Sequence, residues 1–322
     1  MVLVPDFNLL AATAFLDGFR AANYLAGVRL YEWSMISHAG RNIRASNGMM
    51  TSVQEFDQFS APTPFDLVVI NSSWTPEAYR DPVLLNWLRK QARGGARLGG
   101  LDTGVFLLGY AGLLGGASYA LHFEHIAAAQ EIFPDILIHE GLFTHERSRF
   151  SAAGGVAALD LALNMIGEEH GADLAQAAAS YVFHERIRSG AERQTDFHML
   201  GGGNFPPILL QALSMMHSNL DQPLKISEIA GELDVSQRQL DRVFIRYTGQ
   251  SPVRNYLDIR LSHAFRLVTQ TDLSFLEVAV ASGFSSREHF SRAYKKRFGL
   301  SPSDGRLRGR TPFQFRTDIS AR

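Results

Sequence analysis

The chain has 322 residues, 46% of them hydrophobic and 20% charged, a composition that argues against extensive disorder and, at this length, predicts two folded domains. It contains no cysteine, which excludes disulfides, thiolate metal sites and a cysteine nucleophile. Residues 205–322 hold 17 Lys and Arg against 11 Asp and Glu, whereas residues 1–204 hold 14 against 21, so the C-terminal part is the one expected to meet a polyanion.

Residues 1–170 alternate between strand-like and helix-like patterns. The predicted strands cover residues 1–5, 31–38, 65–71 and 96–102. The predicted helices cover residues 11–23, 82–93 and 155–168. Strands that alternate with helices predict a parallel sheet with helices on both faces, an α/β fold of flavodoxin-like type.

Two features bear on location. No basic stretch or small-residue cleavage site accompanies the first apolar run, so we expect no secretory signal and a cytoplasmic protein. Residues 103–121 carry no charge and are long enough to suggest a membrane span. Five glycines interrupt them, so we predict a buried helix, a glycine turn and a strand instead, and no membrane partner.

The stretch GGLDTGVFLLGYAGLLGG (residues 99–116) predicts a strand that enters a sharp turn and then a helix. We call this turn, at Asp102, the elbow. In many α/β enzymes the residue at such a turn is a nucleophile. A carboxylate is a poor nucleophile for amide chemistry, and neither His122 nor His125 completes a dyad without one, so no catalytic residue is predicted. We also expect no metal and no cofactor.

Around QTDFHMLGGGNFPP (residues 194–207) the alternation stops, and glycines and prolines indicate a connection between domains. After it the pattern is helical throughout. The predicted divisions are residues 1–190, a connection over 191–207, an all-α domain over 208–307 and a tail over 308–322.

The helical part repeats itself, since residues 227–252 parallel residues 275–302. Each copy has a small residue, Ala230 or Ala279, where two helices would approach closely. A serine follows as the expected N-cap of the second helix: Ser236 in the first copy, and Ser285 or Ser286 in the second. The pattern predicts two helix-turn-helix units.

In each second helix the apolar side chains share one face and polar ones the other. A solvated charged surface is the alternative to a DNA contact. The matched caps, cores and arginine spacing favour DNA, because Arg can bond guanine bidentately in the major groove. The outward residues are Gln237, Arg238, Asp241 and Arg242 in the first helix, and Arg287, Glu288, His289 and Arg292 in the second.

Residues 208–307 resemble the DNA-binding domain of the AraC/XylS family, above all in GFSSREHFSRAYKKRFGLSP (residues 283–302). The resemblance implies two recognition helices in successive major grooves of double-stranded operator DNA, a homodimer, and RNA polymerase as a further candidate partner. It carries base-reading roles to Arg238, Asp241, Arg242, Arg287, Glu288, His289 and Arg292. Asp241 could accept from a cytosine amine but would repel phosphate.

Residues 1–185 resemble the class I glutamine amidotransferase-like superfamily, which includes PfpI-type peptidases, and within it the GlxA-like branch fused to AraC-type domains. The segments that carry this likeness are VPDFNLLAATAFLDGFRAANYLAG, ASNGM, LGGLDTGVFLLGYAGLLGG with LHFEH, and SAAGGVAALDLALNMI. Enzymes of the superfamily have Cys where this chain has Asp102. The branch includes regulators of arginine, carnitine and glycine-betaine catabolism, several with Asp at the elbow. This chain departs from the branch at Phe123, often Trp, and in residues 70–74, which lack the usual glycine pair.

The elbow can still bind a ligand. Backbone N–H groups of Thr103, Gly104 and Val105 at a helix start favour an anion, and the carboxylate of Asp102 favours an ammonium group. Together they suit a zwitterion such as an amino acid or a betaine-like molecule. The predicted ligand-binding residues are Asp102, Thr103, Gly104, His122, Phe123, Phe7 and Trp74. Core packing is the alternative for each aromatic residue, a structural role is the alternative for His122, and Asp102 could be a buried structural acceptor.

The sequence thus predicts a sequence-specific DNA-binding transcription regulator that senses a small zwitterionic effector through a catalytically inactive domain. Two alternatives stay open at this point. One is an amidase or hydrolase with an appended DNA-binding domain, and the other is a regulator whose N-terminal domain only dimerises.

Overall fold

The computed structural model of the protein describes residues 1–56, 65–194 and 205–309. The chain divides into two compact units, Met1–Asp196 and Phe197–Arg322. Residues 195–204, the middle of the expected connection, and residues 310–322, nearly all of the expected tail, lie outside the described residues. None of the described helices has the length and apolar character needed to cross a membrane.

The first unit is built on a sheet of seven described strands in the order β10-β11-β7-β6-β1-β2-β5. All neighbouring pairs are parallel except β10 and β11. The strands are β1 (Val2–Leu3), β2 (Ile36–Ser37), β5 (Gln54–Glu55), β6 (Leu67–Ser72), β7 (Arg97–Asp102), β10 (Phe143–His145) and β11 (Arg149–Ala152). Two small pairs lie outside this sheet: β3 (Asn42–Arg44) with β4 (Met50–Ser52), and β8 (Ser118–Ala120) with β9 (Leu137–His139).

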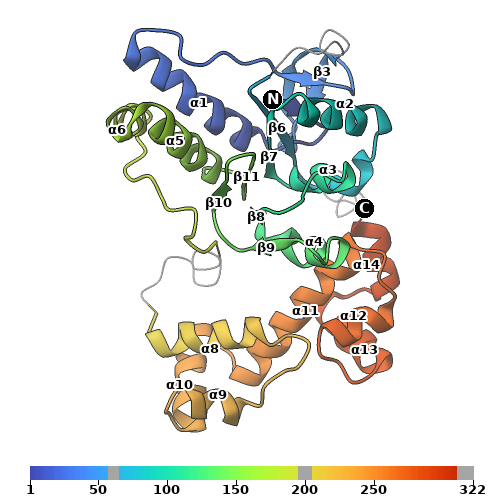
Figure 1. The fold of residues 1–322 in the computed structure, drawn as a ribbon. Helices are drawn as coiled ribbons and strands as arrows, with labels where there is room; N and C mark the ends of the chain where they lie inside the picture. The colour runs from blue at the N-terminus through green and yellow to red at the C-terminus, as the bar shows by residue number, and fades with distance from the viewer. Residues whose placement is uncertain (57–64, 195–204, 310–322) are drawn as a thin grey trace. The chain divides into compact units, whose positions relative to one another are not determined.

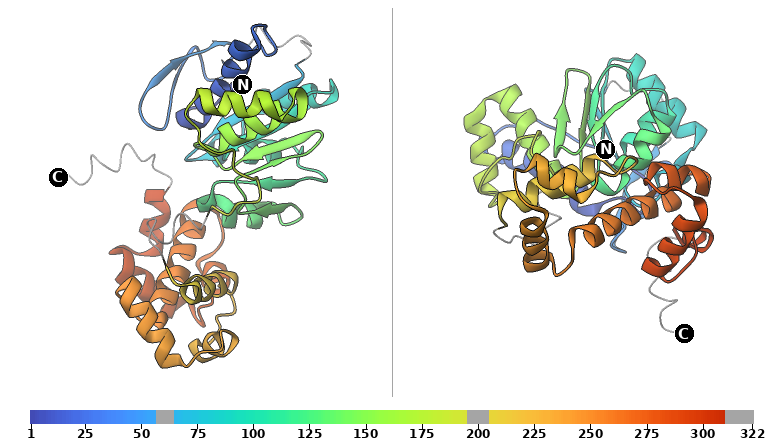
Figure 2. Two further views of the ribbon diagram at one scale, coloured as in Figure 1. Left: turned by 90° about the vertical axis from the view of Figure 1, so that its left-hand side faces the viewer. Right: turned by 90° about the horizontal axis from the view of Figure 1, so that it is seen from below.

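Helices cover both faces of this sheet, which confirms the predicted α/β class (Figures 1 and 2). One face carries α1 (Leu9–Ala26), α5 (Ala157–His170) and α6 (Ala172–Tyr181), which pack on one another and on Val69. The other face carries α2 (Pro82–Arg93), α3 (Val105–Tyr110) and α4 (Ile126–Ile132). Alternate residues of β6 point to opposite faces, as the period of a strand requires. Val68 and Ile70, on either side of Val69, pack with the buried residues of α2, α3 and α4.

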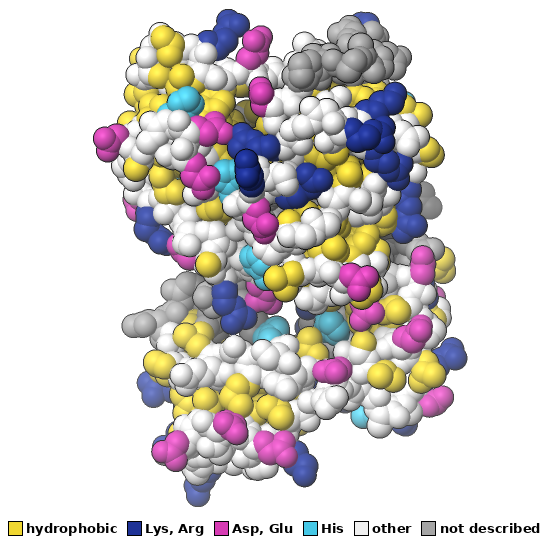
Figure 3. Space-filling model, viewed as in Figure 1, with side chains coloured by type: hydrophobic (Ala, Val, Ile, Leu, Met, Phe, Trp, Pro, Cys, Tyr) yellow, Lys and Arg dark blue, Asp and Glu magenta, His cyan; other side chains and the backbone are white. Residues whose placement is uncertain are grey.

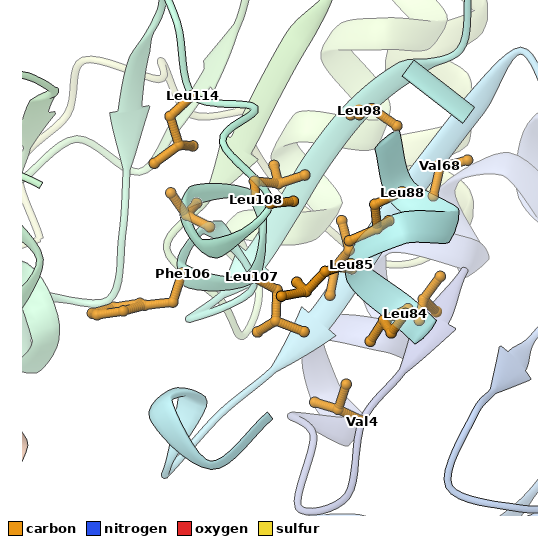
Figure 4. Packing of buried hydrophobic residues seen from close by; sticks show 14 of the residues in the cluster. Val4, Val68, Leu84, Leu85, Leu88, Leu98, Phe106, Leu107, Leu108 and Leu114 are labelled. Atoms are coloured by element: carbon orange, nitrogen blue, oxygen red, sulfur yellow. The ribbon is translucent and has the colours of Figure 1, made fainter. Parts of the chain in front are cut away.

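The packing of α2 shows how the sequence pattern builds this core. Asp81 caps the helix through the N–H of Val83, and Pro82 fits the first turn, where no hydrogen-bonded N–H is needed. Its leucines then recur at helical spacing on one side. Figure 4 shows Leu84, Leu85 and Leu88 beside Leu107 of α3.

The predicted strand over residues 31–38 is wrong for its first half, because only Ile36–Ser37 forms β2. The side chain of Asn23 in α1 accepts the N–H groups of Leu30 and Tyr31, each at 2.8 Å, and donates to the carbonyl of Tyr31 at 2.7 Å. These backbone groups are therefore bonded to a helix side chain rather than to a neighbouring strand.

All the described secondary-structure elements of the second unit are helices, as predicted. Its elements are α8 (Pro207–Ser218), α9 (Ile226–Glu232), α10 (Gln237–Thr248), α11 (Pro252–Gln270), α12 (Phe275–Ala281), α13 (Arg287–Phe298) and α14 (Pro302–Gly309). Figure 3 shows charged and hydrophobic side chains interspersed on the face of each unit seen in Figure 1.

The start of the expected connection is not free chain. Arg193 forms a β-bridge with Gly141, and the amide group of Gln194 donates to the carbonyls of Leu121 and Gly141. The oxygen of the same amide accepts the N–H of Phe123 at 3.0 Å. These hydrogen bonds attach Arg193 and Gln194 to the first unit, so the order of the first unit extends past the predicted end at residue 190.

Candidate functional site

Two helix-turn-helix units, α9 with α10 and α12 with α13, occupy the predicted positions in the second unit. Ala230 and Ala279 are buried where the helices of each unit meet. The turns use left-handed backbone, at Asp234 with φ 52° and at Gly283 with φ 69°. Glycine adopts this conformation without strain, and Asp is among the few other residues that tolerate it.

Both second helices begin at a serine N-cap. The hydroxyl of Ser236 accepts the N–H of Gln239, and the hydroxyl of Ser286 accepts the N–H of His289. Of the two serines left open in the second copy, Ser286 is therefore the cap. Of these two helices, only α10 has a full capping box, because the Gln239 side chain accepts the N–H of Ser236 in return at 2.8 Å.

The amphipathic pattern of these helices places the predicted DNA-contacting side chains outward. Leu240 and Phe244 in α10, and Phe290 and Tyr294 in α13, are fully buried. Asp241 is half-buried, and the other predicted residues are exposed: Gln237, Arg238, Arg242, Arg287, Glu288, His289 and Arg292.

Two hollows flank α13, and cations line both. One of about 430 Å³ lies against α11 and is lined by Arg254, His289, Arg292, Lys296 and Arg297 among others. The other, of about 260 Å³, is bounded by Arg287, Arg292 and Lys295 together with the start of α14. Arg254 and Arg297 both approach the carboxylate of Asp258, at 3.4 and 3.3 Å. Lys296, which lines the first of these hollows, was not singled out from sequence, although the run KKR is its visible signal.

Part of the basic excess of the second unit is structural. The guanidinium of Arg260 donates to the carbonyls of Ser282 and Gly283 at 2.8 and 2.5 Å, and lies 4.6 Å from the ring centre of Phe284. Arg306 donates to the carbonyls of Val268 and Leu273. These two arginines hold the second helix-turn-helix unit together and are unavailable to DNA.

In the first unit, the elbow has the predicted geometry. β7 ends at Asp102, whose φ of 59° is left-handed, and α3 begins at Val105. Glycine is required at position 104, because a Cβ there would lie 2.1 Å from the carbonyl oxygen of Ile70. The turn is therefore pressed closely against β6.

The carboxylate of Asp102 is held inside the unit, with 4% of the residue exposed. Its Oδ2 accepts a hydrogen bond from Asn8 Nδ2 at 2.8 Å and a long one from Ser73 Oγ at 3.4 Å. Burial raises the pKa of this carboxyl, while the charge of His122 and the bonds from Asn8 and Ser73 lower it, and burial prevails. The structure thus supports a structural contact for Asp102, made by side chains rather than by its own turn.

Thr103 is anchored within the protein through its side chain, and one of the predicted backbone donors, that of Gly104, is already used. The hydroxyl of Thr103 donates to the carbonyl of Ser73 at 2.6 Å, and Thr103 is fully buried. The N–H of Gly104 donates to the carbonyl of Leu101 at 3.0 Å. The expectation that the Gly104 N–H points to an anion needs correction for this structure, because the turn consumes that donor.

The aromatic residues predicted at the pocket lie in different surroundings. Phe7 is fully buried and packs with Leu3 and Ala12, so it contributes to the core and presents no surface to a ligand here. His122 and Phe123 are half-buried, with ring centres 4.6 Å apart. Trp74 follows β6 and is 42% exposed.

Sequence reasoning missed the residues that support the elbow. Asn8 caps α1 by accepting the N–H of Ala11, and its amide nitrogen bonds Asp102. Asn71 in turn donates to the carbonyl of Asn8 at 2.8 Å. Asn8 was recognisable as an N-cap by its position before an apolar helix. Its bond to a residue 94 positions away had no sequence signal.

The comparisons with known proteins agree with this architecture. A helix-turn-helix domain family model matches residues 229–308. The chain is 37% identical over 307 residues to the HTH-type transcriptional regulator GbdR of Pseudomonas aeruginosa, covering 95% of this chain and 83% of GbdR. It is 33% identical over 308 residues to the HTH-type transcriptional regulator GlxA of Rhizobium meliloti, covering 95% of this chain and 94% of GlxA.

Solved structures resemble the first unit. A crystal structure of an AraC family transcriptional regulator from Pseudomonas putida matches with a TM-score of 0.52 and 28% identity, over 56% of this chain and 96% of that one. A THiJ/PfpI family protein from Pseudomonas syringae matches with a TM-score of 0.50 at 18% identity, over 57% of this chain and 74% of that one, which supports the fold alone. The chain belongs to the AraC family of DNA-binding transcription regulators, with homologues of GbdR and GlxA type and a PfpI-like first unit.

Proposed function

We propose that this regulator senses a small zwitterionic metabolite, an amino acid or a betaine-like molecule, at the elbow of its first unit. The observation that carries the proposal is the half-satisfied carboxylate of Asp102. Asn8 and Ser73 hold Oδ2, whereas Oδ1 accepts no hydrogen bond from the described residues. A fixed carboxylate with one oxygen unused is suited to an ammonium group, whose charge would also favour the ionised form.

The surroundings of Asp102 support the same ligand class. His122 and Phe123 are half-buried, and Trp74 is exposed, so these rings are available to border a pocket. An aromatic ring face attracts a quaternary ammonium group. With the Gly104 donor used in the turn, the N–H groups of Thr103 and Val105 are the candidates for the ligand's carboxylate.

We propose that the second unit reads the operator through the outward residues of α10 and α13, as a homodimer acting in the cytoplasm, with RNA polymerase as a further partner. The exposure of the arginines and the cationic hollows beside α13 support this arrangement.

We propose that the first unit does not catalyse. Asp102 occupies the nucleophile position, and the chain has no cysteine. Assays for hydrolysis of amide, ester and peptide substrates test this directly, since turnover that Asp102→Asn abolishes would favour the amidase alternative.

The sensing proposal is tested by calorimetric titration of the full chain with a panel of amino acids and betaines. Asp102→Asn keeps the shape of the elbow and removes its charge, so affinity for the effector should fall about tenfold to a hundredfold, the equivalent of ~1.5–3 kcal/mol. DNA binding without effector should not change. The matched control is Asp173→Asn, an exposed carboxylate on α6, away from both the elbow and the opposite end of the sheet.

Melting curves separate a ligand role from a scaffold role. Unaltered effector affinity with a lowered melting temperature in Asp102→Asn would contradict the proposal and leave Asp102 as scaffold. If Asp102→Asn does not fold, Trp74→Ala changes an exposed side chain of the same site and should weaken the same titration. Absence of binding by every member of the panel would favour the reading in which the first unit only dimerises.

A further inference from the structure

The first unit contains a cavity of about 800 Å³ at the end of the sheet opposite the elbow. Leu67 and Arg97, which begin β6 and β7, line it together with the middle of α1 and the C-terminal part of α5. Val69, the lining residue of the strands that is nearest the elbow, pairs with Gly99, so three residues or roughly 10 Å of strand separate the cavity from Asp102, and no elbow residue lines it. The cavity is therefore distinct from the proposed effector site.

The inner wall of the cavity is apolar. Phe15, Phe19, Val69 and Met165 are buried residues from α1, β6 and α5 that line it. Its volume lies in the range of about 300–1,000 Å³ that is usual for small-molecule sites. The space is thus suited to the hydrophobic body of an organic molecule.

The outer wall is a loop held in a defined conformation. Residues 28–35 connect α1 to β2, and Asn23 fixes them through its bonds to Leu30 and Tyr31. The ring of Tyr31 packs 4.5 Å from that of Phe19, and its hydroxyl donates to Glu169 at 3.0 Å. Trp33 of this loop also lines the cavity and is 39% exposed. The cavity is therefore preformed by specific contacts.

Carboxylates supply most of the charge at the mouth of the cavity. The amino group of Met1 lines it too, but burial lowers its pKa to about 5 and it donates to the Ser34 carbonyl at 2.6 Å. Arg97 is neutralised by Glu169 at 2.6 Å. Burial and the neighbouring Glu169 raise the pKa of Tyr31, so its hydroxyl stays protonated as a donor. Glu32 pairs only loosely, at 3.7 Å, with an exposed arginine. The carboxylate of Asp66 is exposed and forms no hydrogen bond or ion pair with any described residue.

We propose that this cavity is a second ligand site, which takes an organic cation with an apolar body, such as an arylalkyl amine or a short alkylammonium. The apolar body lies against Leu16 and Phe19, and the ammonium group lies at the mouth near Asp66. The ring of Trp33 adds a cation–π contact. The site is independent of the elbow, so it stands whether or not the zwitterion proposal is correct.

The test uses the full chain and three probes with one body and different heads: 4-phenylbutylamine, 4-phenylbutan-1-ol and 4-phenylbutyrate. Calorimetry should give the amine about threefold to tenfold tighter binding than the alcohol, and the carboxylate the weakest binding. Asp66→Asn should weaken amine binding about twofold to fivefold, as expected for a solvent-screened charge, and leave the alcohol unchanged. Asp102→Asn should leave all three titrations unchanged.

A variant that fills the cavity provides a second readout. Leu16→Trp replaces a half-buried lining residue of α1 and should abolish binding of all three probes, whereas Leu25→Trp, at an exposed position on the same helix, should not. If Leu16→Trp lowers the melting temperature, Trp33→Ala serves in its place and should weaken the amine most. Equal affinity for the three probes, or amine binding lost in Asp102→Asn but kept in Asp66→Asn and Leu16→Trp, overturns the proposal.

Discussion

The two recognition helices, α10 and α13, share a backbone plan but differ in charge. Both follow a serine cap and end at a glycine in left-handed conformation, Gly249 with φ 73° and Gly299 with φ 74°. The exposed side of α10 holds three cations and one carboxylate, whereas that of α13 holds five and one. The difference lies in the last turns, where Ile245, 57% exposed, corresponds to Lys295. Helix geometry and electrostatics are thus encoded by separate residues.

The turns before these helices differ in the same way. Asp234 is exposed in the first turn. A Cβ at Gly283 in the second turn would lie 2.5 Å from the carbonyl oxygen of Leu220 and 2.5 Å from Pro223 Cγ. Arg260 also binds the second turn from the other side. We infer that the second helix-turn-helix unit is more rigidly built than the first and makes the stronger electrostatic contact with DNA. The predictions below test this comparison.

The largest effect is expected from the turn itself. Gly283→Ala adds a methyl group in left-handed backbone against the Leu220 carbonyl, so the free energy of unfolding should fall by about 2–5 kcal/mol. Asp234→Gly, at the matched turn, should change it by less than about 1 kcal/mol, because Gly relieves strain but frees the unfolded chain. Urea unfolding followed by circular dichroism measures both. Equal effects would contradict the inferred difference in rigidity.

The next largest effect, a loss of operator affinity, is expected from the matched arginines of α10 and α13. Arg242→Ala and Arg292→Ala should each weaken binding to a selected operator by ~1–3 kcal/mol, since each removes one bidentate base contact, while the fold survives. Arg93→Ala, on α2 of the first unit, is the control. Titration of specific and random duplexes at one salt concentration distinguishes the roles, because equal losses on both would show phosphate contact only.

The caps should have a smaller effect on stability. Ser236→Ala and Ser286→Ala should each cost about 0.5–2 kcal/mol. The loss should be larger at Ser236, because its bond with Gln239 is reciprocal. Thermal unfolding of both variants decides the order, and a larger loss at Ser286 would show that the capping box does not distinguish the two helices.

The smallest effect, measured at low salt, should come from exchanging one charge. Ile245→Lys should steepen the dependence of the logarithm of DNA affinity on the logarithm of salt by about 0.9, and Lys295→Ile should reduce it by about 0.9. The reason is the gain or loss of one phosphate contact at matched positions. Slopes that do not change would mean that these last turns point away from the DNA backbone.

Local signals carried much of the fold. The amphipathic pattern of the leucines predicted α2 with its observed bounds, Pro82–Arg93, and the serines of the repeat predicted where the recognition helices begin. Such signals act over a few residues, through caps and left-handed backbone. The strand predicted over residues 31–38 failed in its first half because Asn23, on a preceding helix, binds that backbone.

At the elbow, too, some features were predictable from the sequence and others were not. The sharp turn at Asp102 was predictable from the glycines around it, and its left-handed conformation agrees. Whether an aromatic residue lines a pocket or fills the core was not predictable. Phe7 and Trp74 are both aromatic, and both were predicted to line the pocket at the elbow. Only their packing separates them, one fully buried and the other 42% exposed.

By itself the sequence determined the class of each domain, the two helix-turn-helix units, the absent cysteine and the position of the elbow, because hydrophobic period, caps and composition are local properties. The tertiary structure alone decided which polar groups meet. It brought Asn8 to Asp102, bound Arg260 to the second turn, and left a cavity between α1, α5 and the start of the sheet. These contacts join residues far apart in the chain, and packing, not local propensity, determines them.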